Sequence, residues 1–268
     1  MQTSVIESFT CSKTGDEKDN EDGFLISGGY IAVLDGATSK TSARFGDKTG
    51  GQFLRDCIIA ALSCLEGGES CQTAMDTIRR HIRAEADRFA PEHAAASAII
   101  YSRALRQIWS VGDCQARIGD TLIQKTKLVD RILAETRAFA LNALLAQGRS
   151  IDSLMEEDTG RELILPLLKL QRQFENRSGP YGYSVFNTDP HDPGGFQAEV
   201  YDVPAGSTVV LASDGYPILR ETLNQTEKEL AEVLAEDPLL CRRFLSTKGV
   251  LRGNRSYDDR TYVRFVAE

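Results

Sequence analysis

Residues 30–38 read Tyr-Ile-Ala-Val-Leu-Asp-Gly-Ala-Thr, a short apolar run that ends in an aspartate and a glycine. The apolar part, residues 31–34, contains β-branched side chains and is bounded by glycines, which predicts a buried strand. Asp35 then lies at the end of a rigid element, where its oxygens stay accessible. Gly36 lets the backbone turn sharply and lets its carbonyl approach a ligand. The stretch therefore predicts a metal ligand at the edge of a sheet.

The composition is that of a globular chain with a sizeable core. The 268 residues are 41% hydrophobic and 26% charged, so we expect residues 1–268 to form a single domain. The net charge of −8 argues against binding to nucleic acid or to an anionic membrane. No apolar run approaches the length of a membrane span, and the first residues do not resemble a signal peptide. We therefore expect a soluble, cytoplasmic protein.

Periodicity predicts an alternation of strands and helices. Strands are expected at 4–11, 24–27, 31–34, 97–101, 107–111, 115–118, 197–203, 208–212 and 260–266. Helices are expected at 53–65, 70–89, 221–235 and 238–245. Tight turns connect the strands between residues 97 and 118, which predicts an antiparallel meander.

The sequence also contains one glycine-rich segment and one long helical segment. Residues 46–51 resemble a phosphate loop but lack its G-x-x-x-x-G-K-[ST] spacing, so we interpret them as the entry to the helix at 53–65. Residues 121–196 are interpreted as a helical insertion with two helices. The second of these has the Ser-x-x-Glu form of a capping box at 153–156, and Pro166 should kink or divide it. The insertion is a candidate lid or partner surface, with simple scaffolding as the alternative.

Carboxylates recur where strands end or turn. Asp35 and Asp214 each follow an apolar strand and precede a glycine, Asp258 precedes the last strand, and Glu21 and Asp113 lie at turns. Each residue alone has a simple explanation, because Asp is common in turns. Several carboxylates gathered at one sheet edge would repel one another unless cations neutralised them. An all-oxygen site favours Mg²⁺ or Mn²⁺ over zinc.

Five segments in this order carry a family resemblance: Asn-Glu-Asp (20–22), Val-Leu-Asp-Gly (33–36), Val-Gly-Asp-Cys (111–114), Leu-Ala-Ser-Asp-Gly (211–215) and Asp-Asp-Arg-Thr (258–261). They resemble the ordered motifs of the metal-dependent PP2C (PPM) protein phosphatases of the bacterial type. The resemblance covers about residues 4–120 and 197–268. It implies an α+β fold, an antiparallel β-sandwich flanked by helices in α/β/β/α layers, with a metal centre at one end.

The resemblance also implies a set of metal ligands: Glu21, Asp35, Gly36, Asp113, Asp214 and Asp258. Asp35 would bridge two Mn²⁺ or Mg²⁺ ions with the Gly36 carbonyl assisting, and Glu21 would bind the second ion through an oxygen or a water. Asp214 and Asp258 would hold the first ion, and Asp113 with Asp214 a third, weaker one. Asp35 and Asp214 would be catalytic through a metal-activated water that attacks phosphorus without a covalent intermediate.

Some positions depart from the family pattern. Glu17 stands where members usually carry the arginine that grips the substrate phosphate. Lys18 is our candidate substitute, with Lys13 as another, although an ammonium lacks the bidentate geometry of arginine. Ala37 stands where animal members have a histidine, a candidate general acid, and Gln115 replaces the arginine of the third motif.

Three functions are compatible with these residues. The leading one is a protein serine/threonine phosphatase acting on a phosphorylated protein. The second is a non-catalytic PP2C-like module that binds a phosphorylated partner, which the departures motivate. The third keeps the metal hydrolase but takes a small phosphorylated molecule as its substrate.

Overall fold

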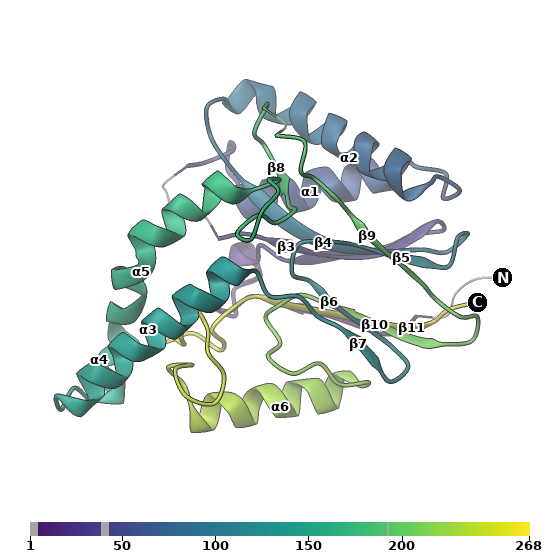
Figure 1. Ribbon diagram of the computed structural model, residues 1–268. Coiled ribbons are helices and arrows are strands. Elements are labelled where there is room, and N and C mark those ends of the chain that lie inside the picture. Colours follow the sequence, from purple (N-terminus) through teal and green to yellow (C-terminus); the bar gives the residue numbers. More distant parts are fainter. Residues whose placement is uncertain (1–4, 39–42, 192) are drawn as a thin grey trace.

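Two antiparallel sheets are stacked face to face in the computed structural model, which describes residues 5–38, 43–191 and 193–268 (Figure 1). The first sheet, sheet A, has the strand order β1 (Val5–Cys11), β11 (Arg260–Val266), β10 (Thr208–Ala212), β6 (Gln115–Ile118) and β7 (Thr121–Ile123). The second, sheet B, has the order β2 (Gly23–Ile26), β3 (Tyr30–Gly36), β4 (Ala95–Ser102), β5 (Gln107–Val111) and β9 (Glu199–Asp202), with β8 (Phe186–Asn187) paired to β4.

Strand β3 is apolar throughout because both of its faces are buried. Ile31 and Val33 face sheet A and belong to the core between the sheets. Ala32 and Leu34 face the other way and pack with the helices that cover sheet B. Those helices are α1 (Gly50–Ser63) and α2 (Cys71–Ala86), and a 3-10 turn (Asp87–Phe89) follows α2. A strand buried on both faces reads as a continuous apolar run rather than an alternating one.

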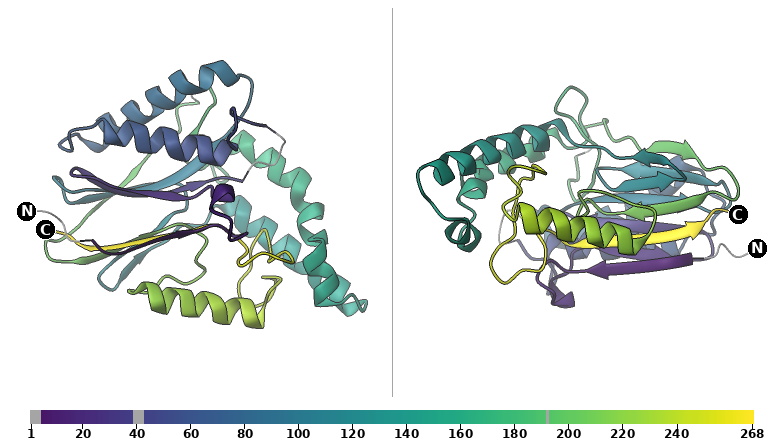
Figure 2. Two further views of the ribbon diagram at one scale, coloured as in Figure 1. Left: turned by 180° about the vertical axis from the view of Figure 1, so that it is seen from behind. Right: turned by 90° about the horizontal axis from the view of Figure 1, so that it is seen from below.

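Helix α6 (Leu223–Glu236) covers the outer face of sheet A. Its Leu230 and Val233 pack with Val210 of β10 and Tyr262 of β11. The order of layers is therefore helices, sheet B, sheet A, helix, as the left view of Figure 2 shows from behind. The predicted α/β/β/α sandwich is confirmed.

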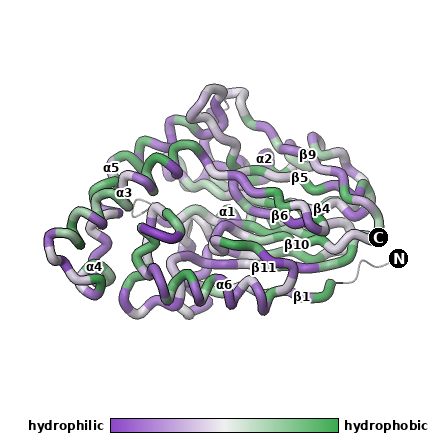
Figure 3. The backbone as a smooth tube through the Cα atoms, turned by 60° about the horizontal axis from the view of Figure 1, so that its bottom comes forward, coloured by the Kyte–Doolittle hydropathy of each residue, from purple (hydrophilic) through white to green (hydrophobic). Residues whose placement is uncertain are grey.

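Three helices extend from one end of the sandwich, at the end opposite to both termini (Figure 1). They are α3 (Leu128–Ala146), α4 (Ile151–Glu156) and α5 (Thr159–Leu170), and a 3-10 turn (Gln171–Phe174) follows α5. We call residues 128–170 the helical arm. Hydrophobic residues follow both long helices of the arm (Figure 3), and several are exposed, among them Phe139 at 77% and Leu163 at 61%.

The structure corrects several predictions for this region. Residues 121–123 belong to sheet A, because β7 pairs with β6. The arm has three helices rather than two, and the side chain of Ser150, not Ser153, caps α4. Asp158 caps α5, which continues through Pro166 without being divided. Residues 238–245, predicted to be helical, form turns and bends.

The predicted antiparallel meander between residues 97 and 118 is also wrong. β4 and β5 are antiparallel neighbours in sheet B, but β6 belongs to sheet A. The chain crosses between the sheets at Gly112, whose φ of +90° favours glycine. A Cβ there would also lie 2.2 Å from the Ser97 hydroxyl. Periodicity identified β4, β5 and β6 but could not tell which sheet each of them joins.

The interpretation of residues 46–51 as a helix entry is confirmed. Thr49 and Gln52 form a reciprocal capping box at the start of α1. None of the described helices is long and apolar enough to cross a membrane.

Candidate metal centre

Three aspartates from separate parts of the sandwich meet at the end that bears the helical arm. Asp35 comes from the end of β3, Asp113 from the crossing between β5 and β6, and Asp214 from the residues after β10. Each offers a carboxylate oxygen, and these oxygens lie within 4.8 Å of one another. The sequence prediction that these carboxylates converge is therefore consistent with the geometry.

Gly36 allows this end of β3 to lie against α1. A Cβ on Gly36 would lie 2.6 Å from backbone atoms of Gly51 in the first turn of α1. Such a contact is too short for any side chain, so the close approach of strand and helix requires glycine at this position. The Gly36 backbone lines the same cavity as Asp35.

The negative charge of this cluster is incompletely neutralised. Burial raises the pKa of Asp35 well above its usual value, and repulsion from nearby carboxylates raises it further. Burial, followed by repulsion from Asp35 and Asp113, does the same to the pKa of Asp214. Among the described residues, no ammonium or guanidinium group forms an ion pair with either carboxylate. Carboxylates in this state fit a divalent cation with oxygen ligands.

Asp22 is a member of the site to which sequence analysis gave no role. Its side chain is buried, and its Oδ2 atom has no hydrogen-bond partner among the residues that the structure describes. Burial raises the pKa of Asp22, and the carboxylates of Asp258 and Asp214 raise it further. An orphaned buried oxygen is unusual in proteins and is satisfied when a cation or an ordered water binds it. Its sequence signal was its place in the acidic pair Glu21-Asp22 at a turn, of which only Glu21 was given a metal role.

Lysines contact the other predicted ligands. The Lys127 ammonium lies 2.8 Å from Asp113, and the Ser97 hydroxyl donates to the other oxygen of Asp113 at 2.6 Å. These contacts lower the pKa of Asp113 although burial opposes them. Lys248 forms an ion pair with Asp258. The residues therefore fit cations best at Asp35 and Asp214, whereas a cation at Asp113 or Asp258 competes with a lysine.

Glu21 is held by a hydroxyl and an ammonium group. The Thr49 hydroxyl donates to Glu21 at 2.6 Å, and the Lys13 ammonium lies 3.9 Å from it. The backbone N–H groups of Glu21 and Lys13 both donate to the carboxylate of Asp259. Asp259 thus organises the backbone around the site, while Asp258 faces the cavity.

Two further sequence positions can now be placed. Lys18, the predicted phosphate-binding residue, is exposed on a 3-10 turn (Glu17–Asp19) and does not line the cavity. Gln115 is buried and donates its side-chain amide to the carbonyls of Ser213 and Tyr216. It therefore braces the loop that carries Asp214.

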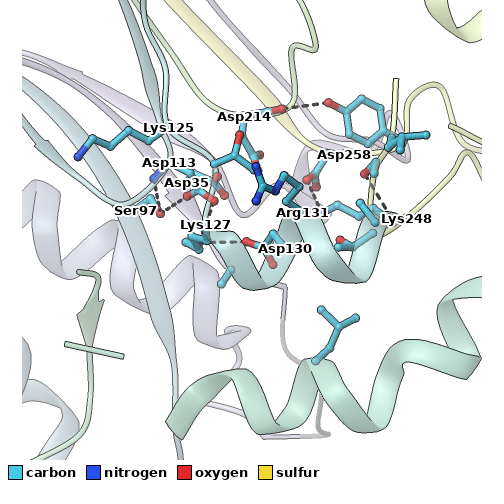
Figure 4. Close-up of a pocket in the computed structure, with 18 of the residues that line it drawn as sticks. Asp35, Ser97, Asp113, Lys125, Lys127, Asp130, Arg131, Asp214, Lys248 and Asp258 are labelled. Atoms are coloured by element: carbon cyan, nitrogen blue, oxygen red, sulfur yellow. Dashed lines mark hydrogen bonds and ion pairs between the residues drawn. The ribbon is translucent and has the colours of Figure 1, made fainter. Parts of the chain in front are cut away.

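A cavity of about 640 Å³ lies between the acidic cluster and the helical arm. Asp35, Asp214 and Asp258 line the side of the sandwich, and Lys127 and Arg131 line the side of the arm (Figure 4). The Tyr257 hydroxyl donates to the Asp214 carbonyl at 2.9 Å and fixes one wall. The cavity places a concave, charged space directly over the carboxylates.

The raised pKa values predict that the metal-free protein loses stability as the pH rises. Asp22, Asp35 and Asp214 bind protons more tightly in the folded state than in the unfolded state. Their contribution is therefore complete below about pH 4 and is lost as the pH rises through the raised pKa values. Acids whose pKa is lowered, such as Glu69 at about 2, titrate below this window and do not offset the trend.

Urea unfolding in EDTA at about pH 5.5 and about pH 8 measures this effect. We expect the lower midpoint at the higher pH, and we expect Mn²⁺ to remove or reverse the difference because a cation replaces the protons. A midpoint in EDTA that does not change with pH would contradict the repulsion described above.

Comparison with known proteins identifies the fold. No protein-family model matches this sequence, and no curated protein sequence does. A bacterial serine phosphatase aligns with a TM-score of 0.53 at 13% identity, over 100% of this chain and 98% of that one. The PPM Ser-Thr phosphatase MsPP from Mycobacterium smegmatis, solved in complex with cacodylate, aligns with a TM-score of 0.50 at 13% identity, over 99% of this chain and 100% of that one.

A third solved structure is the catalytic domain of the serine/threonine protein phosphatase PstP in complex with two manganese ions. It has a TM-score of 0.49 and 17% identity, and the alignment covers 98% of this chain and 97% of that one. Likeness at these identities concerns the course of the backbone and not the chemistry. The chain has the fold of the bacterial PP2C-type (PPM) serine/threonine phosphatases.

Proposed function

We propose that this protein is a phosphatase dependent on Mn²⁺ or Mg²⁺ that hydrolyses phosphoserine and phosphothreonine esters of proteins. The observation that carries the proposal is the gathering of Asp35, Asp113 and Asp214 within 4.8 Å beneath a cavity. Closely spaced carboxylates that repel one another destabilise a protein unless something binds them. The fold, which two solved phosphatases share at full coverage, supports the same proposal.

Asp35, Asp214 and the Gly36 carbonyl are the groups that would hold the cations, with Asp22 beside them. Glu21, Asp113 and Asp258 are further ligands once their lysines move aside. Divalent cations bound there would lower the pKa of a water molecule and offset the charge of the phosphoryl group. The chain itself contributes the ammonium groups of Lys127 and Lys248, which line the cavity and add positive charge near an incoming phosphate.

Burial alone would lower the pKa of these two lysines, but the neighbouring carboxylates outweigh it. The pKa of Lys127 is raised by Asp113 and Asp130, and the pKa of Lys248 by Asp258 and Asp214. Both lysines therefore stay protonated at neutral pH. They are suited to neutralise a phosphate dianion rather than to donate a proton to the leaving group.

Hydrolysis of p-nitrophenyl phosphate and of phosphoserine or phosphothreonine peptides tests the proposal. We expect purified protein to hydrolyse both with Mn²⁺ or Mg²⁺ and to lose this activity in EDTA, because the proposed nucleophile is a water molecule whose pKa only a bound cation would lower. Activity should return when the metal is added back in excess. Hydrolysis that continues unchanged in EDTA would exclude a metal centre.

A non-catalytic phosphoprotein-binding module is the second candidate, and one observation favours it. Lysines form ion pairs with Asp113, Asp258 and Asp259, so internal cations already neutralise part of the cluster. Calorimetry with Mn²⁺ separates the two functions. Binding of Mn²⁺ below about millimolar concentration supports the enzyme, and absence of binding supports the module.

A further inference from the structure

The helical arm presents an arginine to the candidate metal centre that sequence analysis did not single out. We propose that Arg131 of α3 binds the phosphate group of the substrate, so that the arm supplies the phosphate-binding cation. This inference rests on the proposed phosphatase function and specifies how its substrate is held. It also gives the arm a role in the reaction in place of simple scaffolding.

Arg131 differs from the other cations around the cavity because its side chain has no partner among the described residues. The lining contains five cationic side chains among the described residues: Lys125, Lys127, Arg131, Arg161 and Lys248. The three lysines form ion pairs with carboxylates, and Arg161 donates to the carbonyl of Thr247 at 2.8 Å. The Arg131 guanidinium makes no ion pair or hydrogen bond to any described residue, so its donors are free to bind a ligand.

The position of Arg131 on α3 directs its side chain toward the candidate metal centre. It lies one turn after Lys127, so the two side chains project from the same face of the start of α3. Figure 4 shows both residues extending from α3 into the cavity, toward the side where Asp35, Asp113 and Asp214 lie. A phosphate held at the carboxylate-bound cations would therefore have Arg131 on its outer side.

The start of α3 adds a second attraction for an anion. Helix α3 begins at Leu128, and no side chain caps its first N–H groups. Residues 124–128 and 130–131 line the cavity, so the N-terminal end of this long helix faces the same space. The N-terminus of a helix carries a partial positive charge and unpaired N–H donors that favour phosphate. Asp130 lies in the same turn but is engaged by Lys127 and by the Gln171 amide.

The N-terminal loop cannot supply this cation in the observed arrangement. Lys18 is exposed outside the cavity, and Glu17 accepts a hydrogen bond from Asn20. Lys13 is occupied by Asp259, at 3.4 Å, and by the neighbouring Glu21. An arginine is also better suited than these lysines, because its planar guanidinium can donate two parallel hydrogen bonds to a phosphate.

Inhibition by inorganic phosphate tests the proposal directly. We expect Arg131→Ala to raise the inhibition constant of phosphate and the KM for p-nitrophenyl phosphate roughly 10- to 100-fold, the effect of losing a charged hydrogen-bond pair. Arg131→Lys should recover part of the loss. The Mn²⁺ affinity measured by calorimetry should stay unchanged, because Arg131 touches no carboxylate of the cluster. The matched control is Arg172→Ala, since Arg172 is an exposed arginine outside the cavity.

The outcomes separate this inference from the proposed function. If hydrolysis depends on Mn²⁺ but Arg131→Ala leaves both phosphate inhibition and KM unchanged, the role of Arg131 is wrong and the phosphatase stands. If Arg131→Ala weakens Mn²⁺ binding by the same factor as phosphate binding, Arg131 is a structural residue and the inference is overturned. If wild type binds phosphate through Arg131 with Mn²⁺ present but hydrolyses nothing, the inference holds and the phosphatase is wrong.

Discussion

The Asp214→Asn variant is expected to lose Mn²⁺-dependent hydrolysis by about 1,000-fold or more while its metal-free form becomes more stable than wild type. The loss of activity follows because Asp214 lies beside Asp35 and Asp113 and forms no ion pair with a cation in the part of the chain that the structure describes. An amide in its place binds a divalent cation weakly and contributes no charge. Asp35→Asn should behave in the same way, because Asp35 lies in the same cluster.

The gain in stability has a separate physical cause. Burial and repulsion raise the pKa of Asp214 in the folded state, so its charged form is disfavoured there. Removing the charge should therefore stabilise the metal-free protein near neutral pH, by no more than about 1 kcal/mol because solvent screens this partly exposed group. Urea unfolding in EDTA measures this change, and p-nitrophenyl phosphate hydrolysis with Mn²⁺ measures the other.

A matched substitution shows whether both effects belong to the cluster. Asp120 is a fully exposed carboxylate in the turn between β6 and β7, so Asp120→Asn should change neither activity nor stability beyond about 0.5 kcal/mol. The combination expected for Asp214 is unusual, since most substitutions of buried residues destabilise. An Asp214→Asn protein that is inactive and also less stable in EDTA would indicate a structural hydrogen-bonding role instead.

The sheets were predictable from the sequence because their strands carry clear local patterns. Strands β5, β6, β10 and β11 have the predicted bounds, and Asp35 and Asp214 lie at the expected strand ends. The pairing of β5 and β6 was not predictable, because a tight turn at Gly112 leads into a hairpin and into a sheet crossing with equal ease. The local sequence pattern identifies a strand, whereas the strand with which it pairs depends on contacts between residues distant in the sequence.

The cations of the site were harder to predict than its acids. Lys127 and Lys248 lie in segments whose local sequence does not distinguish them from surface lysines, and only the packing of the arm brings them to Asp113 and Asp258. Arg131 likewise belongs to an amphipathic helix in which a charged residue is ordinarily a solvated one. The phosphate-binding role of Lys18 was predicted from its position close to the Asn-Glu-Asp motif in the sequence. In the structure Lys18 does not line the cavity.

Arg137→Met is expected to cost about 3–5 kcal/mol of unfolding free energy, the largest stability effect among the substitutions considered for this chain. Arg137 is fully buried. Its guanidinium forms a two-pronged ion pair with Asp158 at 2.7 and 3.0 Å, and it donates to the carbonyls of Leu239 and Ser246 at 2.8 and 3.1 Å. Methionine fills much of the same volume but leaves a carboxylate and two carbonyls without these donors.

The same interactions connect the helical arm to the candidate metal centre. We therefore expect Arg137→Met to disturb the metal centre as well as to lower the free energy of unfolding. Asp158 caps α5 and also accepts from the Gly249 N–H at 3.1 Å, next to Lys248. Losing Arg137 therefore loosens both α5 and the segment whose lysine contacts Asp258. Urea unfolding with and without Mn²⁺ measures the loss, and we expect Mn²⁺ to recover only part of it because the cation does not replace the arm's anchor.

A second arginine provides the control for this substitution. Arg243 forms an ion pair with Glu236, but both side chains are largely accessible to solvent, at 35% and 64%. Arg243→Met should therefore cost no more than about 1 kcal/mol, as exposed ion pairs usually do. Adding Asp158→Asn to Arg137→Met should recover part of the loss by removing the stranded charge. Equal losses for the two arginines would show that the buried pair does not anchor the arm, and no recovery in the double variant would place the cost in the unpaired carbonyls instead.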